Sequence, residues 1–156
     1  MKLNEIGLNI EQSKELVIKL NNLLSNFQVY YQNLRGVHWN IKGKEFFVLH
    51  PKFEELYTDA QEKVDMIAER ILTLSGTPLH TFKDYMENAA VPIGQNVTKD
   101  EEAVKLIIAS LTEIILIERI ILELSDDAND EGTNSMMSDF ISEQEKTIWM
   151  LKSWQG

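Results

Sequence analysis

The segment from Asn33 to Ile71 decides the fold, and it reads NLRGVHWNIKGKEFFVLHPKFEELYTDAQEKVDMIAERI. In its second half, apolar residues recur every three or four positions: Phe53, Tyr57, Ala60, Val64, Ile67 and Ile71. This spacing predicts a long helix from about Phe46 to Leu74 with one apolar face. Pro51 lies near its start, so either regular helix begins near His50 or the helix bends there.

Three further long helices are predicted outside this one. The first runs from about Asn9 to Trp39, and residues 40–44, with Gly43 among them, form the short turn that follows it. Thr98 and Glu101 have the spacing of a capping box, which would begin a third helix that ends near Ser125. The fourth runs from about Asn134 to Trp154 after the acidic loop DDANDEGT.

The connections between these helices are short, long and short. The long connector spans Ser75 to Val97, and the sequence TFKDYMENA within it favours a short helix. Short links make antiparallel neighbours, and one long crossover is typical of the ferritin-like topology. We therefore predict an all-α, ferritin-like four-helix bundle with one long crossover carrying a short extra helix, forming a single domain over residues 1–156.

A polar stripe borders the apolar face of the helix at 46–74. His50 and Glu54 are four residues apart, as are Asp65 and Glu69, so each pair lies on one helix face and can share a metal ion. Eleven residues separate Glu54 from Asp65, which is roughly 16 Å along the helix axis. Because metal ligands approach the ion to about 2 Å, one chain cannot close a site with all four residues.

Two antiparallel copies of this helix, related by a two-fold axis, would close the site. His50 and Glu54 of one chain would then face Asp65 and Glu69 of the partner subunit, and two-fold symmetry would repeat the site. The midpoints of the two pairs are fifteen residues apart, which places the two sites roughly 22 Å apart. Each residue taken alone is more typical of a solvated helix face. The whole stripe is equally consistent with a metal site and with a dimer seam that binds no metal.

Composition excludes several classes of function. The chain has no cysteine, which excludes disulfides, thiolate zinc sites and cysteine nucleophiles. Its formal net charge is −10, and neither the first ten residues nor the terminal KSWQG is rich in lysine. Since DNA binding normally depends on a basic patch, we expect weak or no DNA binding. A negative field attracts cations instead.

The strongest apolar run is LIIASLTEIILIERIILEL, at residues 106–124, and it contains four charged residues. Those charges argue against a membrane span. The apolar residues of the run fall on more than one helix face, which indicates burial within an assembly. The N-terminus has no apolar segment of the signal-peptide type, and with the absence of cysteine this predicts a cytoplasmic location.

Residues 33–71 resemble the Dps family, the DNA-binding proteins from starved cells, as does EKTIWMLKSW at 145–154. The specific features are His-Trp-Asn at 38–40, a second histidine twelve residues later, and D-x-I-A-E-R at 65–70. The resemblance covers nearly the whole chain, and a short helix within the crossover is also a feature of the family.

The resemblance implies a hollow shell of twelve subunits, a dodecamer, with ferroxidase centres between two-fold-related subunits. Carried over residue by residue, His38, His50 and Glu54 come from one chain, and Asp65 and Glu69 from its partner. Each centre would hold two iron ions at most. Many members have aspartate where this chain has Glu54, which keeps the carboxylate on a side chain one methylene longer. No Glu-x-x-His sequence occurs, which argues against an intrasubunit di-iron centre.

The implied chemistry is oxidation of Fe(II) by hydrogen peroxide, with ferric mineral stored inside the shell and protection against oxidative damage. Trp39 would pack near the site and trap stray oxidising equivalents; the alternative is a core aromatic that ends its helix. Asp130 is expected to line a pore through which iron enters the shell; the alternative is a solvated turn. His80 is expected to have no metal role.

Three functions remain in competition at this point. The first is an iron-storing ferroxidase, and the second is a nucleoid-compacting DNA-binding protein with minor iron chemistry. The third is a structural helical bundle whose polar stripe serves only as a dimer seam.

Overall fold

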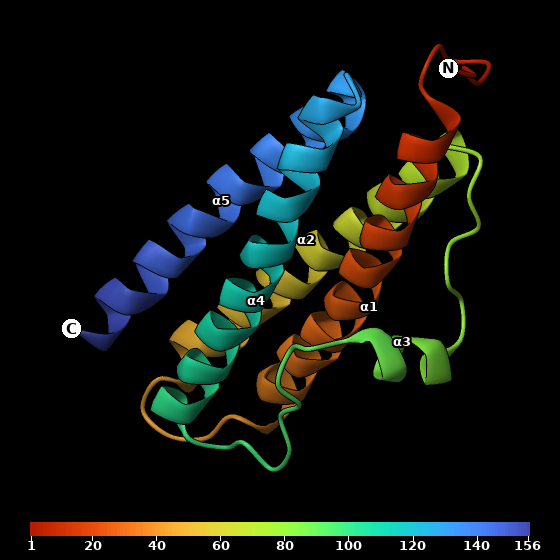
Figure 1. Cartoon of the computed structure of the whole chain (residues 1–156). Coiled ribbons are helices and arrows are strands. Elements are labelled where there is room, and N and C mark those ends of the chain that lie inside the picture. Colours follow the sequence, from red (N-terminus) through yellow and green to blue (C-terminus); the bar gives the residue numbers. More distant parts are fainter.

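Two helical hairpins form the bundle (Figure 1). The computed structural model describes all 156 residues. Its helices are α1 (Ile10–Asn40), α2 (Phe46–Thr73), α3 (Phe82–Asn88), α4 (Asp100–Asp127) and α5 (Glu131–Gln155). α1 packs on α2 and α4 on α5, and contacts between α1 and α4 join the two hairpins. The predicted all-α bundle with short, long and short connections, and a short helix in the long one, is confirmed.

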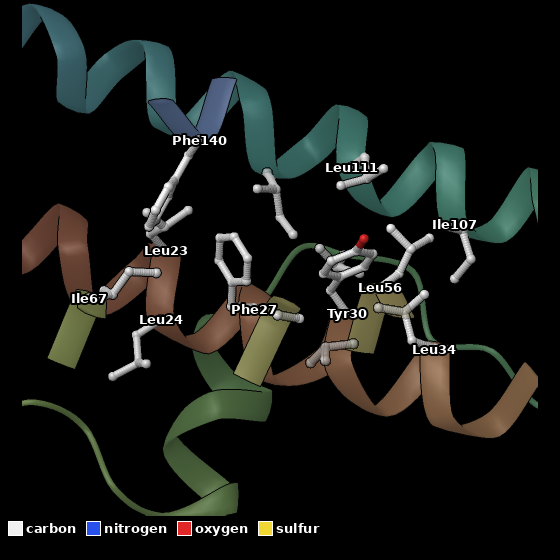
Figure 2. Packing of buried hydrophobic residues seen from close by; sticks show 14 of the residues in the cluster. Leu23, Leu24, Phe27, Tyr30, Leu34, Leu56, Ile67, Ile107, Leu111 and Phe140 are labelled. Atoms are coloured by element: carbon white, nitrogen blue, oxygen red, sulfur yellow. The ribbon is translucent and has the colours of Figure 1, made fainter. Parts of the chain in front are cut away.

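The core lies between the two hairpins (Figure 2). Phe27 of α1 is fully buried there and makes aromatic contacts with Tyr30 and with Phe140 of α5, at ring-centroid distances of 6.0 and 6.1 Å. Apolar side chains of α2 and α4 complete the core, among them Leu56, Ile67, Ile107 and Leu111. None of the helices combines the length and the apolar character that a membrane crossing requires.

The turn between α1 and α2 determines where the candidate ligands lie. Gly43 has a φ of +114°, a conformation that other residues rarely adopt. After this turn α2 begins at Phe46 and continues through Pro51, so the regular helix starts four residues before His50. As a result, the segment that carries His50 is already helical and lies beside the last turn of α1.

Asparagines of α1 hold the long crossover against the bundle. Asn26 is fully buried, and its Oδ1 accepts hydrogen bonds from the backbone N–H groups of Ala90 and Val91, at 2.8 and 3.0 Å. Asn33 donates to the carbonyl of Pro92 at 2.7 Å and accepts from the N–H of Gly94 at 2.9 Å. These bonds satisfy backbone groups that no regular element pairs, so the irregular connector follows a defined path along α1.

Two predicted helix starts are wrong. α4 begins at Asp100 after Lys99, with no side-chain cap, so Thr98 and Glu101 form no capping box. Three acids in its first turn, residues 100–102, interact favourably with the helix dipole instead. α5 begins at Glu131, three residues before the predicted start, because the side chain of Asp130 caps it.

Candidate metal centre

The two histidines lie face to face at one end of the α1–α2 hairpin. His38 is in the last turn of α1 and His50 is near the start of α2. Their rings stack with centroids 3.8 Å apart and an angle of 10° between the planes. The short turn therefore brings together two residues that are twelve positions apart in the sequence.

Each histidine is hydrogen-bonded to the backbone of the other. Nδ1 of His38 lies 2.6 Å from the carbonyl oxygen of His50, and Nδ1 of His50 lies 2.6 Å from the carbonyl oxygen of His38. A carbonyl can only accept, so each Nδ1 carries the proton and donates it. In the neutral imidazoles, Nε2 then has the free lone pair that a metal needs. The pairing fixes the tautomer of both rings and leaves two ring nitrogens free to bind a metal.

Aromatic rings enclose this pair. Phe46 stacks on His50 at a centroid distance of 4.6 Å, and Tyr57 stands edge-on to His38 at 5.3 Å. His38 is consequently 7% exposed, whereas His50 is only partly buried. The rings are held in position before any metal binds.

The three candidate carboxylates lie along α2. Glu54 is one turn beyond His50 and is exposed, and its Oε1 accepts a hydrogen bond from the hydroxyl of Tyr57 at 3.3 Å. Asp65 and Glu69 lie further along the same helix and are also exposed. Within the single chain, no three histidine or acidic side chains converge as a metal-holding group. The structure thus brings His38 and His50 together, whereas Glu54 lies one helical turn beyond His50 and Asp65 and Glu69 lie further along α2.

Trp39 follows His38 and lies at the end of α1. Its side chain is 55% exposed, so the alternative of a core aromatic is wrong. The guanidinium of Arg35 lies over its ring, 4.7 Å from the centroid, and 5.3 Å from the centroid of Tyr31. Such a cation–π contact holds the indole at the surface without burying it.

Asp130 is buried at the start of α5, with 2% of its surface exposed. Its carboxylate accepts hydrogen bonds from the backbone N–H of Thr133 at 3.0 Å and from Arg70 of α2 at 2.6 Å. The hydroxyl of Thr133 donates to the other carboxylate oxygen. In this chain Asp130 is a helix cap joined to α2, and its role in an iron pore stays a prediction.

His80 lies in the crossover and is exposed. Its Nδ1 is 3.0 Å from the carbonyl of Pro78, and it joins no cluster of ligands.

Sequence reasoning missed the surroundings of the ligands. The periodicity places Tyr57 in the apolar stripe of α2, although its position three residues after Glu54 is a usable signal, because such residues are neighbours on a helix. Phe46 and Arg35 give no signal of their contacts, since the side-chain directions depend on how the turn at Gly43 packs.

Comparisons with known proteins identify the family. The sequence model of the ferritin family, described as a ferritin-like domain, matches residues 18–156. A DNA protection during starvation protein of Porphyromonas gingivalis is 42% identical over 95% of this chain and 93% of its own length. The crystal structure of a Dps protein from Vibrio cholerae O1 superposes with a TM-score of 0.97 at 48% identity, covering 100% of this chain and 98% of that one. The chain belongs to the Dps family.

Other members of the Dps family agree with this assignment. The Dps structure from Staphylococcus aureus has a TM-score of 0.88 at 33% identity, over 92% of this chain and 96% of that one. The Vibrio cholerae protein is described as a member of a broad superfamily of ferritin-like diiron-carboxylate proteins. Dps membership therefore supports iron binding, iron storage and oxidative protection as the general role of this chain.

Proposed function

We propose that this Dps-family chain is a ferroxidase. It oxidises Fe(II) with hydrogen peroxide at centres shared between two-fold-related subunits, and stores the ferric product as mineral in a hollow dodecamer. The observation that carries the proposal is the His38–His50 pair, in which both Nδ1 atoms are bonded to backbone carbonyls and both Nε2 atoms remain free. Imidazole nitrogens with carboxylate oxygens suit iron well.

The positions of the carboxylates support a shared centre. His38 and His50 stack on each other and Glu54 lies one helical turn beyond His50. The pair Asp65 and Glu69 lies roughly 22 Å further along α2, measured from the midpoint of His50 and Glu54. Both of these acids are exposed, and their side chains have no ion pair or hydrogen bond within the chain. An antiparallel α2 from a second copy brings Asp65 and Glu69 of the partner subunit to the open side of the histidine pair.

The residues present fit iron as a substrate. In the proposed reaction, two Fe(II) ions each give one electron to one hydrogen peroxide, its O–O bond breaks, and two protons complete two water molecules. Two iron ions at one centre deliver both electrons together, so no hydroxyl radical is released. Trp39, which follows His38 in the sequence and is exposed, takes up stray oxidising equivalents in this proposal.

The DNA-compacting alternative has less support in this chain. Its net charge is −10, and the N-terminal residues fold back as a turn instead of extending as a basic arm. Ile10 donates its N–H to the carbonyl of Lys2 at 3.0 Å, and the side chain of Asn4 accepts from Leu8 at 2.9 Å. Direct binding to phosphates is therefore expected to be weak or absent.

The proposal is tested by stopped-flow oxidation of Fe(II) on addition of peroxide to the anaerobic, iron-loaded protein. Replacing His50→Ala together with Asp65→Ala should abolish the fast phase and leave the assembly intact by size-exclusion chromatography. The matched control is His80→Ala with Glu101→Ala, which removes an exposed histidine and an exposed acid away from the centre and should keep the wild-type rate. Normal fast oxidation by the first variant would show that the site assignment is wrong.

A further inference from the structure

Glu54 is a candidate ligand on a long and flexible side chain. It is exposed, and no cation in the chain pairs with its carboxylate. A glutamate has one more rotatable bond than an aspartate and loses more conformational entropy when it is fixed. A metal ligand on so long a side chain needs something to orient it.

Tyr57 is the side chain that contacts this carboxylate. Its hydroxyl donates to Oε1 of Glu54 at 3.3 Å across one turn of α2. Oε2 of Glu54 accepts no hydrogen bond, so it is the oxygen available for an ion. The contact leaves Glu54 able to bind metal through one oxygen while the other is held.

The ring of Tyr57 is itself held by α1. It stands edge-on to His38 at a centroid distance of 5.3 Å with an angle of 79°, and edge-on to Tyr31 at 5.9 Å with an angle of 84°. The ring is partly buried and packs against the apolar core. Tyr57 thus links a fixed nitrogen ligand, His38, to the flexible oxygen ligand, Glu54.

We infer that Tyr57 is a positioning residue, which orients the Glu54 carboxylate beside the His38–His50 pair. This inference rests on the proposed function, because it takes Glu54 to be a ligand. Residues that orient a metal ligand typically contribute about 10- to 100-fold to metal affinity. The hydrogen bond is long, so we expect an effect of about 10-fold, at the lower end of that range.

The test measures Co(II) binding to the assembled protein by isothermal titration calorimetry and by the visible ligand-field spectrum. Co(II) prefers similar ligands to Fe(II), and binding alone is measured without any oxidation step. Tyr57→Phe keeps the ring and its contact with His38 but removes the hydroxyl, and should weaken Co(II) binding by about 10-fold. The matched control is Tyr31→Phe, which removes a hydroxyl from the neighbouring ring and should leave the affinity unchanged.

A second background separates positioning from general packing. In a Glu54→Asp protein the shorter carboxylate no longer reaches the Tyr57 hydroxyl, so adding Tyr57→Phe should change Co(II) affinity by less than about two-fold. An equal loss in both backgrounds would overturn the inference, since the hydroxyl would then act without Glu54. Unchanged affinity in Tyr57→Phe alone would also overturn it. Failure of the wild-type protein to bind Co(II) would instead overturn the proposed function, and the inference with it.

Discussion

Glu118 of α4 lies inside the bundle with none of its surface exposed. Nε2 of Gln144 donates to its Oε1, but Oε2 of Glu118 and Oε1 of Gln144 have no hydrogen-bond partner. Both atoms gain a partner if Glu118 is protonated, because its O–H then donates to the Gln144 carbonyl. Burial raises the pKa of Glu118 to about 8, against the opposing effects of Gln144, Lys63 and Arg119. We therefore expect a neutral acid paired with an amide at pH 7.

This protonation should make stability depend on pH. The folded pKa of Glu118 lies above its ordinary value of 4.5, so the folded chain keeps a proton that the unfolded chain releases. Stability should then fall as pH rises from about 4.5 to about 8, and stay level above that. Each pKa unit corresponds to about 1.4 kcal/mol, which gives a fall of a few kcal/mol.

Glu118→Gln should remove this pH dependence, because a second amide can make both hydrogen bonds with Gln144 at any pH. The charged and titratable groups around this site are Tyr30 of α1, Asp59 and Lys63 of α2, Arg119 of α4 and Glu143 of α5, and the variant keeps them all. The measurement is urea unfolding at fixed protein concentration between about pH 5 and about pH 9.

The control for this comparison is Glu123→Gln, an exposed position on the same helix, which should keep the wild-type pH dependence. If Glu118→Gln retains the wild-type slope, Glu118 does not carry the proton.

At the scale of residues, spacing indicated the candidate ligands but not their surroundings. His50 and Glu54 could be chosen as candidates because an i, i+4 pair shares a helix face whatever the tertiary packing. The burial of Glu118 could not be predicted, because the acids at 113, 118 and 123 recur every five residues with similar apolar neighbours. Which of them faces the core depends on how α4 rotates against α1 and α5, and that is a property of the packed bundle.

At the scale of elements, Asp130 joins α5 to α2. It caps α5 through the N–H of Thr133 and pairs with Arg70 of α2, which also donates to the Thr133 hydroxyl at 2.9 Å. Asp130→Ala removes the cap, worth about 0.5–2 kcal/mol, and leaves the mostly buried Arg70 without a carboxylate to pair with. Breaking a buried ion pair by removing one member costs about 3–5 kcal/mol, so we expect a loss of about 3 kcal/mol or more.

Urea unfolding of Asp130→Ala beside Asp130→Asn separates the two contributions. Asparagine can still cap α5 but has no charge for Arg70, so its stability should lie between those of the alanine variant and the wild type. Asp126→Ala, an exposed acid at the end of α4, should change stability by less than about 0.5 kcal/mol. A wild-type unfolding midpoint for Asp130→Ala would show that the cap and the ion pair contribute little.

The predicted helix bounds lie within two residues of the observed ones, except at the start of α5. α1 begins one residue after the predicted Asn9, and α2 ends one residue before the predicted Leu74. The start of α5 was predicted three residues late because Asp130 was assigned to the acidic loop, although it caps the helix through the N–H of Thr133. The path of the crossover could not be predicted either. Asn26 and Asn33 give no local sign that their side chains accept hydrogen bonds from backbone groups about sixty residues away.

At the scale of the whole molecule, the single chain leaves apolar side chains exposed on several faces. Leu116 and Ile120 of α4 and Trp149 of α5 are 54%, 45% and 64% exposed. The sequence predicts that the apolar residues of 106–124 are buried within an assembly, and these exposed side chains provide surface for subunit contacts. The shell of twelve subunits remains a proposal that rests on the Dps family.

The proposed shared centre predicts complementation between two damaged chains, which a centre within one chain does not allow. One variant carries His50→Ala with Glu54→Ala, and a second carries Asp65→Ala with Glu69→Ala; each alone should lack fast Fe(II) oxidation. In a dimer with one chain of each variant, one centre combines the damaged histidine half of the first chain with the damaged acidic half of the second. The other centre combines the two intact halves. Random pairing of equal amounts makes about half of the dimers mixed, so co-expression should restore about one quarter of the wild-type centres.

The control for this complementation is a pair of variants damaged in the same half of the centre. His38→Ala co-expressed with the His50→Ala, Glu54→Ala chain should restore nothing, because every centre in every dimer then lacks a ligand from its histidine half. Recovery in this control would place His38 outside that half. If the first mixture forms mixed dimers and still shows no recovery, the ligands are not shared between subunits. Only a centre built across the two-fold axis can be intact when each of the two chains carries damaged ligands.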